Sequence, residues 1–225
     1  MKRKKKAVLW LCISLMLLLG MCMTVYAQEN ESWNEPPQKV RITAQKGMAS
    51  SRKYTIYWKR IENIDGYQLE LYDSSNERIF SKKTAADQTS IQLNDIQNSR
   101  VYRFRIRAFY KAENPYTGIT RNVYGTYRTE YICQQPKLKF QWNSKNSVRV
   151  SWNAVENGVD YTVYLSEKRG GTYRKAAKVK TPQATLKKLN METTYYVYVV
   201  ASYRVKDQTY KTAVSSASSF RLQMK

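Results

Sequence analysis

Histidine is absent from this chain of 225 residues, which removes Ser-His-Asp and Cys-His catalysis and the commonest transition-metal ligand. The sequence also contains no phosphate-binding glycine loop, no nucleophile elbow and no cluster of metal ligands at a recognisable spacing. Carboxylates such as Glu62, Asp65, Glu70 and Asp73 occur, but their spacing marks no cooperating pair. We therefore expect no catalytic residue, no metal site and no cofactor, and the chain is predicted not to be an enzyme.

Cysteine is also scarce, with three residues in the whole chain. Cys12 and Cys22 lie in an apolar N-terminal run, so Cys133 is the single thiol of the rest. One thiol cannot form a disulfide within its own chain, and hydrophobic cores must then hold the fold together. Two interpretations of Cys133 remain open, a buried strand cysteine and a cross-link between two chains.

The N-terminal segment has the order of a secretory signal, because five basic residues within the first six precede the uncharged apolar run 7–23. Val25 and Ala27 are the small residues before a cut, so residues 1–27 are predicted to be a signal peptide and the mature chain to begin at Gln28. The alternatives are an uncleaved membrane anchor and lipidation at Cys22, which a preceding bulky methionine disfavours. A signal this basic and compact favours a bacterial source.

The charge is strongly one-sided, with 39 Lys and Arg against 17 Asp and Glu. Loss of the signal removes five basic residues and leaves a net charge near +17. Such a field concentrates anionic polymers near the protein, while a high net charge also serves solubility alone. Both interpretations stay open.

Beyond an acidic, flexible lead-in at residues 28–36, short segments alternate apolar and polar residues with period two, which predicts strands with one buried face. The second half repeats the first. Trp58 is followed by Tyr67 at the same spacing as Trp152 by Tyr161. The expected structural core contains the matched pairs Trp58 and Trp152, Tyr67 and Tyr161, Leu93 and Leu186, Tyr102 and Tyr195.

These repeated residues resemble the fibronectin type III family, in its tandem form in bacterial secreted proteins. The family's second strand carries a core tryptophan, which matches Trp58 and Trp152. Its sixth strand opens with a tyrosine whose hydroxyl bonds back to nearby backbone, which matches Tyr102 and Tyr195. The resemblance implies an all-β fold of two tandem immunoglobulin-like sandwiches.

The repeat sets the expected domain boundaries. Residues 37–134 are predicted to be the first fibronectin type III-like domain and residues 135–225 the second. The first copy is expected to carry a longer loop, from Lys111 to Asn122, that includes Tyr116 at an end of the sandwich where such folds present binding loops. This loop is a candidate partner contact or an insertion without consequence.

The outward faces of the two copies differ. Arg103, Arg105 and Arg107 alternate with inward residues and form a cationic face, which is either a solvated, partly paired surface or an anion site. Family topology implies that Glu70 lies on the neighbouring strand and neutralises part of it. In the second copy, aromatic side chains occupy the corresponding places: Tyr164, Tyr196 and Tyr198. Sugar rings or a partner protein could pack against them.

These features predict a non-enzymatic exported protein that binds a partner or acts as a spacer, secreted or associated with the cell surface. The expected partner is a protein, a glycan or an anionic envelope polymer, with no small-molecule substrate, and a membrane is a partner only if the signal stays uncleaved. The alternative is a basic module that binds wall polymer, a lipid surface or extracellular nucleic acid.

Overall fold

The computed structural model describes residues 35–114, 117–214 and 217–222, and in these ranges the regular elements are all β-strands, with no helix. The predicted signal peptide, most of the lead-in and Tyr116 lie outside the described residues. No helix in the described ranges is long and apolar enough to cross a membrane.

Two sheets form the first domain. Their strands are β1 (Ile42–Met48), β2 (Lys53–Trp58), β3 (Gly66–Tyr72), β4 (Arg78–Ala85), β5 (Ser90–Leu93), β6 (Val101–Glu113), β7 (Thr120–Tyr124) and β8 (Arg128–Cys133). One sheet has the order β1-β2-β5, and the other has the order β4-β3-β6-β7 with β8 also paired to β6. Every pairing between these strands is antiparallel.

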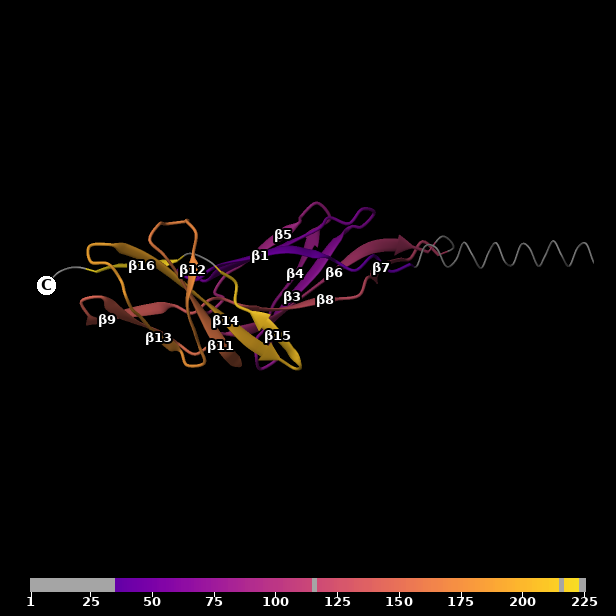
Figure 1. The fold of residues 1–225 in the computed structure, drawn as a ribbon. Helices are drawn as coiled ribbons and strands as arrows, with labels where there is room; N and C mark the ends of the chain where they lie inside the picture. Colours follow the sequence, from indigo (N-terminus) through magenta and orange to yellow (C-terminus); the bar gives the residue numbers. More distant parts are fainter. Residues whose placement is uncertain (1–34, 115–116, 215–216, 223–225) are drawn as a thin grey trace, which may run out of the picture.

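The second domain repeats this plan. Its strands are β9 (Leu138–Ser144), β10 (Ser147–Trp152), β11 (Gly158–Ser166), β12 (Arg174–Val179), β13 (Gln183–Leu186), β14 (Thr194–Val205), β15 (Gln208–Lys211) and β16 (Ser218–Arg221). The sheets have the orders β13-β10-β9 and β12-β11-β14-β15, and β16 pairs with β14. Figure 1 shows the two sandwiches as neighbouring units, indigo to magenta and orange to yellow.

Each sandwich has a filled core built from both of its sheets, because the inward residues of alternating strands meet between them. All eight expected core residues are buried, from Tyr67 at 0% exposed to Trp152 at 6%. The Trp58 and Tyr67 ring centroids are 5.4 Å apart, and Trp152 and Tyr161 repeat this distance at 5.4 Å.

The two corner tyrosines make the backbone bonds that the family resemblance implies. The Tyr102 hydroxyl accepts a hydrogen bond from the Gln97 N–H at 3.1 Å, and the Tyr195 hydroxyl accepts one from the Asn190 N–H at 2.8 Å. Both bonds span five residues. Each fixes the loop that leads into the long strand of its domain, β6 or β14, and so sets where the outward face of that strand begins.

The expectation of a long loop from Lys111 to Asn122 is wrong. Strand β6 continues to Glu113 and β7 starts at Thr120, with Lys111 paired to Asn122 and Ala112 to Arg121. The segment is mostly a β-hairpin that extends the sheet. Polar residues on both of its faces hid the alternation that marks a half-buried strand, and Ala112 is its buried side chain.

The domains meet in a junction of specific contacts. The Val101 N–H donates to the Glu156 carboxylate at 2.8 Å, and the Tyr203 hydroxyl donates to the Tyr131 carbonyl at 2.8 Å. Val101 and Cys133, from the ends of β6 and β8, belong to the hydrophobic core of the second domain. Since residues of one domain complete the core of the other, the junction resists bending more than a simple linker would.

Cys133 is a buried free thiol at the end of β8, as the first of the two interpretations expected. Burial raises the pKa of its thiol to about 12, with a smaller contribution from the negative charge of Glu156. The neutral thiol therefore behaves as a small apolar side chain of the junction.

Candidate binding faces of the two domains

The cationic face of the first domain lies on the sheet β4-β3-β6-β7. Strand β3 pairs with β6 so that Tyr72 lies opposite Arg103, Glu70 opposite Arg105 and Gln68 opposite Arg107, which confirms the expected neighbour strand. The three arginines are half-buried. They lie on one face because outward residues of a strand recur every second position.

Tyrosines cover the three guanidinium groups. The Arg103 guanidinium lies 4.3 Å from the Tyr72 ring centroid, and the Arg105 guanidinium lies 3.7 Å from that of Tyr127. The Arg107 guanidinium is 3.8 Å from the Tyr124 ring and 4.4 Å from the Tyr127 ring. We call this surface the Arg-Tyr face and define it by these arginines and rings: Arg103, Arg105, Arg107, Tyr72, Tyr124 and Tyr127.

Glu70 is the anionic centre of the Arg-Tyr face and is 5% exposed. Its carboxylate oxygens lie 3.7 Å from Arg105 and 3.8 Å from Arg78, and one accepts a hydrogen bond from the Tyr72 hydroxyl at 3.0 Å. Burial and a hydrogen bond to this carboxylate raise the pKa of the Tyr127 hydroxyl. Glu70 neutralises part of the cationic face, as expected.

Arg107 is held by a different partner, the Gln68 side-chain oxygen, which accepts two hydrogen bonds from its guanidinium at 2.9 and 2.7 Å. Its charge has no carboxylate partner within 4.0 Å among the described residues. The Arg-Tyr face is thus a rigid, partly neutralised surface, in which stacking and hydrogen bonds fix the guanidinium planes.

The corresponding surface of the second domain is the tyrosine face, defined by Tyr164, Tyr196 and Tyr198. Tyr164 lies opposite Tyr198 in the pairing of β11 with β14. Their rings stack, with centroids 4.9 Å apart and an angle of 18° between planes. Tyr173, from the segment between β11 and β12, adds a third ring 4.8 Å from Tyr198.

The tyrosine face is half-buried rather than fully exposed. Burial raises the pKa of the Tyr198 hydroxyl, and the neighbouring Tyr164 and Tyr173 add to this shift. Tyr196 lies opposite Ser166 in the same pairing and is half-buried. The face offers neutral aromatic surface to a partner, in which Tyr164 and Tyr198 are ordered by their stacking and Tyr173 packs against Tyr198 from beside the face.

In the described parts of the chain, no group of three or more Cys, Asp or Glu side chains is placed to hold a metal ion. Sequence reasoning missed Tyr124, Tyr127 and Tyr173 as neighbours of the two faces.

Known proteins similar to this chain were found by sequence and by structure, while no protein-family model matches it. It is 23% identical over 161 residues to the Ig-like and fibronectin type-III domain-containing proteins 1 and 2 of Caenorhabditis elegans. The matches cover 65% of this chain, but only 16% and 10% of the two relatives.

Solved structures similar to the chain include a two fibronectin type-III domain segment from chicken tenascin. That match has 17% identity and a TM-score of 0.32, and it covers 83% of this chain and 99% of the other. The FN1–FN3 domains of chicken CNTN1 match with 15% identity and a TM-score of 0.31, over 80% of this chain and 69% of theirs.

Sheet order and core residues agree between the two halves of the chain. Each half combines a three-stranded sheet with a larger one, and each carries the buried tryptophan and the corner tyrosine at matched places. The described part of the chain therefore consists of two tandem immunoglobulin-like β-sandwiches, and the chain is similar in sequence to proteins that contain fibronectin type III domains.

Proposed function

We propose that this protein is exported and acts without catalysis, as a binding and spacing module at the cell envelope or in the surrounding medium. Sandwiches of this kind are typical of non-enzymatic binding or spacer modules and are common in extracellular and cell-surface proteins. The observation that carries the proposal is the pair of filled cores joined by a tight junction, with ordered aromatic and cationic side chains on the outer faces.

The tyrosine face is the proposed contact for a protein or glycan partner. Tyrosine contributes a large contact area at a low entropy cost, which is why it is enriched at binding surfaces. Tyr196 is the best residue for a test because, among the described residues, its ring lies outside the packed group of Tyr164, Tyr173 and Tyr198. Its replacement should change binding with little effect on folding.

The experiment compares retention of the chain from Gln28 onward on envelope material for wild type and Tyr196→Ser. Tyr57→Ser is the matched control, because Tyr57 is 39% exposed and lies in the three-stranded sheet β1-β2-β5 of the first domain, away from the tyrosine face. Loss of retention in Tyr196→Ser alone, at an unchanged melting temperature, supports the proposal. Equal retention of all three proteins contradicts a role for this face.

Export is tested separately by the mass of the protein recovered outside the cell. An N-terminus at Gln28 supports cleavage after Ala27, and a protein that stays entirely inside the cell contradicts the proposed location.

A second candidate function is the binding of anionic polymers. The net charge near +17 of the chain from Gln28 onward favours it, because a field of this sign attracts polyanions over a Debye length. Its test is a salt titration, in which affinity for a polyanion must fall as the salt concentration rises.

A further inference from the structure

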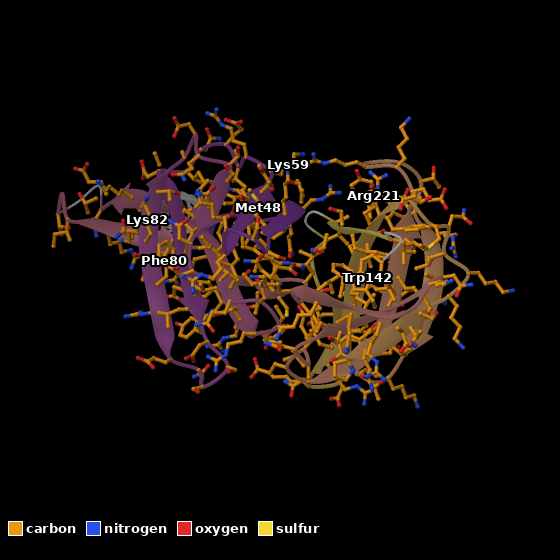
Figure 2. All side chains as sticks on the ribbon, turned by 90° about the vertical axis from the view of Figure 1, so that its left-hand side faces the viewer. Met48, Lys59, Phe80, Lys82, Trp142 and Arg221 are labelled. Carbon is orange, nitrogen blue, oxygen red and sulfur yellow. The ribbon has the colours of Figure 1, made fainter. Side chains whose placement is uncertain are left out.

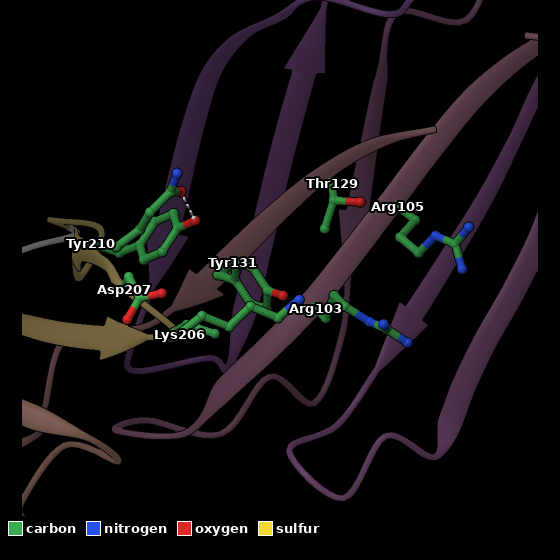
Figure 3. Close-up of a pocket in the computed structure, with 9 residues that line it drawn as sticks. Arg103, Arg105, Thr129, Tyr131, Lys206, Asp207 and Tyr210 are labelled. Carbon is green, nitrogen blue, oxygen red and sulfur yellow. Dashed lines mark hydrogen bonds between the residues drawn. The ribbon is translucent and has the colours of Figure 1, made fainter. Parts of the chain in front are cut away.

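An open groove of about 540 Å³ lies where the two domains meet. Figure 3 shows it between the strands of the first domain and the hairpin that joins β14 to β15. The first domain contributes Arg103, Arg105, Thr129 and Tyr131. The second domain contributes Val205, Lys206, Asp207, Gln208 and Tyr210. The volume is in the range of about 300–1,000 Å³ that is usual for sites of small ligands.

Three cations and one carboxylate line this groove. Within the described residues, Arg103 and Lys206 have no carboxylate oxygen within 4.0 Å, whereas Arg105 shares Glu70 at 3.7 Å. Two of the cations are thus left without a counter-charge, one from each domain. The groove adds a local positive potential to the positive field of the whole chain.

The aromatic part of the groove is ordered. The Tyr131 and Tyr210 ring centroids are 5.3 Å apart in an edge arrangement, and Tyr210 stacks on Tyr203 at 5.8 Å. The Tyr210 hydroxyl donates a hydrogen bond to the Gln208 side-chain oxygen at 2.7 Å. The Tyr131–Tyr210 contact joins the two domains, and the set of contacts gives the groove an ordered aromatic surface beside its charges.

Lys206 occupies an unusual backbone position. It follows Val205, which pairs with Gln208, so Lys206 and Asp207 form the tight turn of the hairpin. Lys206 has a φ of 52°, in the left-handed region where asparagine and glycine are favoured over lysine. The turn geometry does not favour a lysine, and Lys206 is one of the residues that line the groove.

The mixture of groups selects among anionic ligands. Asp207 and Gln208 accept hydrogen bonds from hydroxyl groups, and tyrosine rings pack against the apolar faces of sugars. A sugar chain with one acidic group per ring, and hydroxyls between, meets the cations and the acceptors together.

We propose that the groove at the domain junction binds an acidic oligosaccharide, whose carboxylate or sulfate lies between Arg103 and Lys206. The proposal rests on the second function proposed above and names its site and ligand class. Because the two cations come from different domains, the ligand contacts both sandwiches and stabilises their relative placement. A junction that is already ordered lowers the entropy cost of forming the site.

The test measures the affinity of the chain from Gln28 onward for three probes of similar length. They are an oligogalacturonate, a sulfated oligosaccharide and an uncharged maltooligosaccharide, and a short single-stranded DNA is the competing polyanion. The groove variants are Arg103→Gln and Lys206→Asn. The second is chosen because asparagine suits the left-handed turn, so it should fold at least as well as wild type.

Matched controls remove the same charges elsewhere. Arg169→Gln changes an exposed arginine beyond the end of β11 at Ser166, and Lys187→Asn changes an exposed lysine directly after β13. Strand β11 begins at Gly158, opposite Tyr203, so Ser166 marks the end of that strand remote from the groove. The controls report the loss expected from net charge alone.

We expect each groove variant to weaken binding of the acidic oligosaccharide by about tenfold, since a charge-assisted hydrogen bond is lost. The controls should change it by less than about twofold. Preference for the carboxylate or the sulfate probe identifies which acidic sugar fits. Tighter binding of DNA than of both acidic sugars would overturn the ligand class.

Two further outcomes separate this inference from the function on which it rests. If wild type binds none of the polyanions, both the groove and the second proposed function fail. If wild type binds an acidic oligosaccharide but the groove variants behave like the controls, only the groove assignment fails, and the polymer lies elsewhere on the basic surface.

Discussion

The two domains have equivalent hydrophobic cores and different outward faces. Trp58 with Tyr67 and Trp152 with Tyr161 repeat the same ring distance, and the long strands β6 and β14 hold equivalent places in their sheets. Outward from those strands, the first domain stacks tyrosines on arginines, whereas the second stacks tyrosines on one another. Figure 2 shows the side chains of both sandwiches together.

The difference shows which positions the fold constrains. An inward position must fill a fixed volume, because loss of a buried ring leaves a cavity. An outward position needs only to pack against its cross-strand neighbour, and an arginine over a ring or a ring over a ring both achieve this. The faces could therefore diverge in charge while the cores kept their tryptophan and tyrosine.

The largest effect should come from breaking the shared core. Trp58→Ala and Trp152→Ala should each lower the free energy of unfolding by about 3–5 kcal/mol, since each removes a buried ring. Urea unfolding measures the loss of stability in each variant, and Trp142→Ala is the control because Trp142 is 52% exposed. A loss for Trp142→Ala as large as for the other two would contradict it.

Alkaline pH should weaken the junction. The thiol of Cys133 has its usual pKa near 9 in the unfolded chain, and burial raises that pKa to about 12 in the folded chain. The contribution to stability is intact below pH 9 and is lost as the pH rises towards 12, because the unfolded chain releases a proton that the folded chain keeps. This costs about 1.4 kcal/mol per pH unit.

Burial also raises the pKa of Tyr54, in the first domain, and of Tyr203, in the second, so their contributions fall above pH 10. Urea unfolding across this alkaline range should show the decline, and Cys133→Ala should delay its onset from about pH 9 to about pH 10. An onset unchanged by Cys133→Ala would show that the thiol is not the first group to titrate.

The junction can be broken without touching either face. Glu156→Ala removes the acceptor of the buried Val101 N–H, so the free energy of unfolding should fall by about 1–3 kcal/mol. The control is Glu192→Ala, which removes the exposed ion pair with Arg221 and should cost less than about 1 kcal/mol. Equal losses of unfolding free energy for Glu156→Ala and Glu192→Ala would show that the buried hydrogen bond stabilises the protein no more than the exposed ion pair does.

The faces themselves should give the smallest effects. A double-mutant cycle between Arg107 and Tyr124 should yield a coupling of about 0.5–1 kcal/mol, and one between Tyr164 and Tyr198 about 0.5–1.5 kcal/mol. Arg107→Lys should lose most of the first coupling although it keeps the charge, because lysine lacks the flat guanidinium. Couplings near zero would show that the stacked geometry adds no stability.

The sequence predicted the fold well because a strand with one buried face must alternate apolar and polar residues. Period-two alternation located most strands, and the repeated spacing located the core residues of both domains. It also placed the three arginines on one face, since an inward Phe104 requires outward neighbours. Alternation failed over residues 111–122 of the β6-β7 hairpin, where Ala112 is the one buried residue among those described and gave too little signal.

The covering tyrosines and the groove were beyond reach of the sequence. Tyr127 contacts Arg105 from the segment between β7 and β8, so no local spacing relates the two residues. The groove depends on how one domain is placed against the other, through contacts such as Tyr203 with Tyr131. Periodicity within a strand carries no information about such placement.

The buried thiol of the junction has a practical consequence. In the chain from Gln28 onward, Cys133 is the single cysteine, and it is 0% exposed between the two domains. A thiol reagent can reach it only when this region opens, so its labelling rate measures how often the sandwiches separate. The protein therefore carries a native reporter of its own domain opening, and a ligand that holds the domains together should slow the reaction.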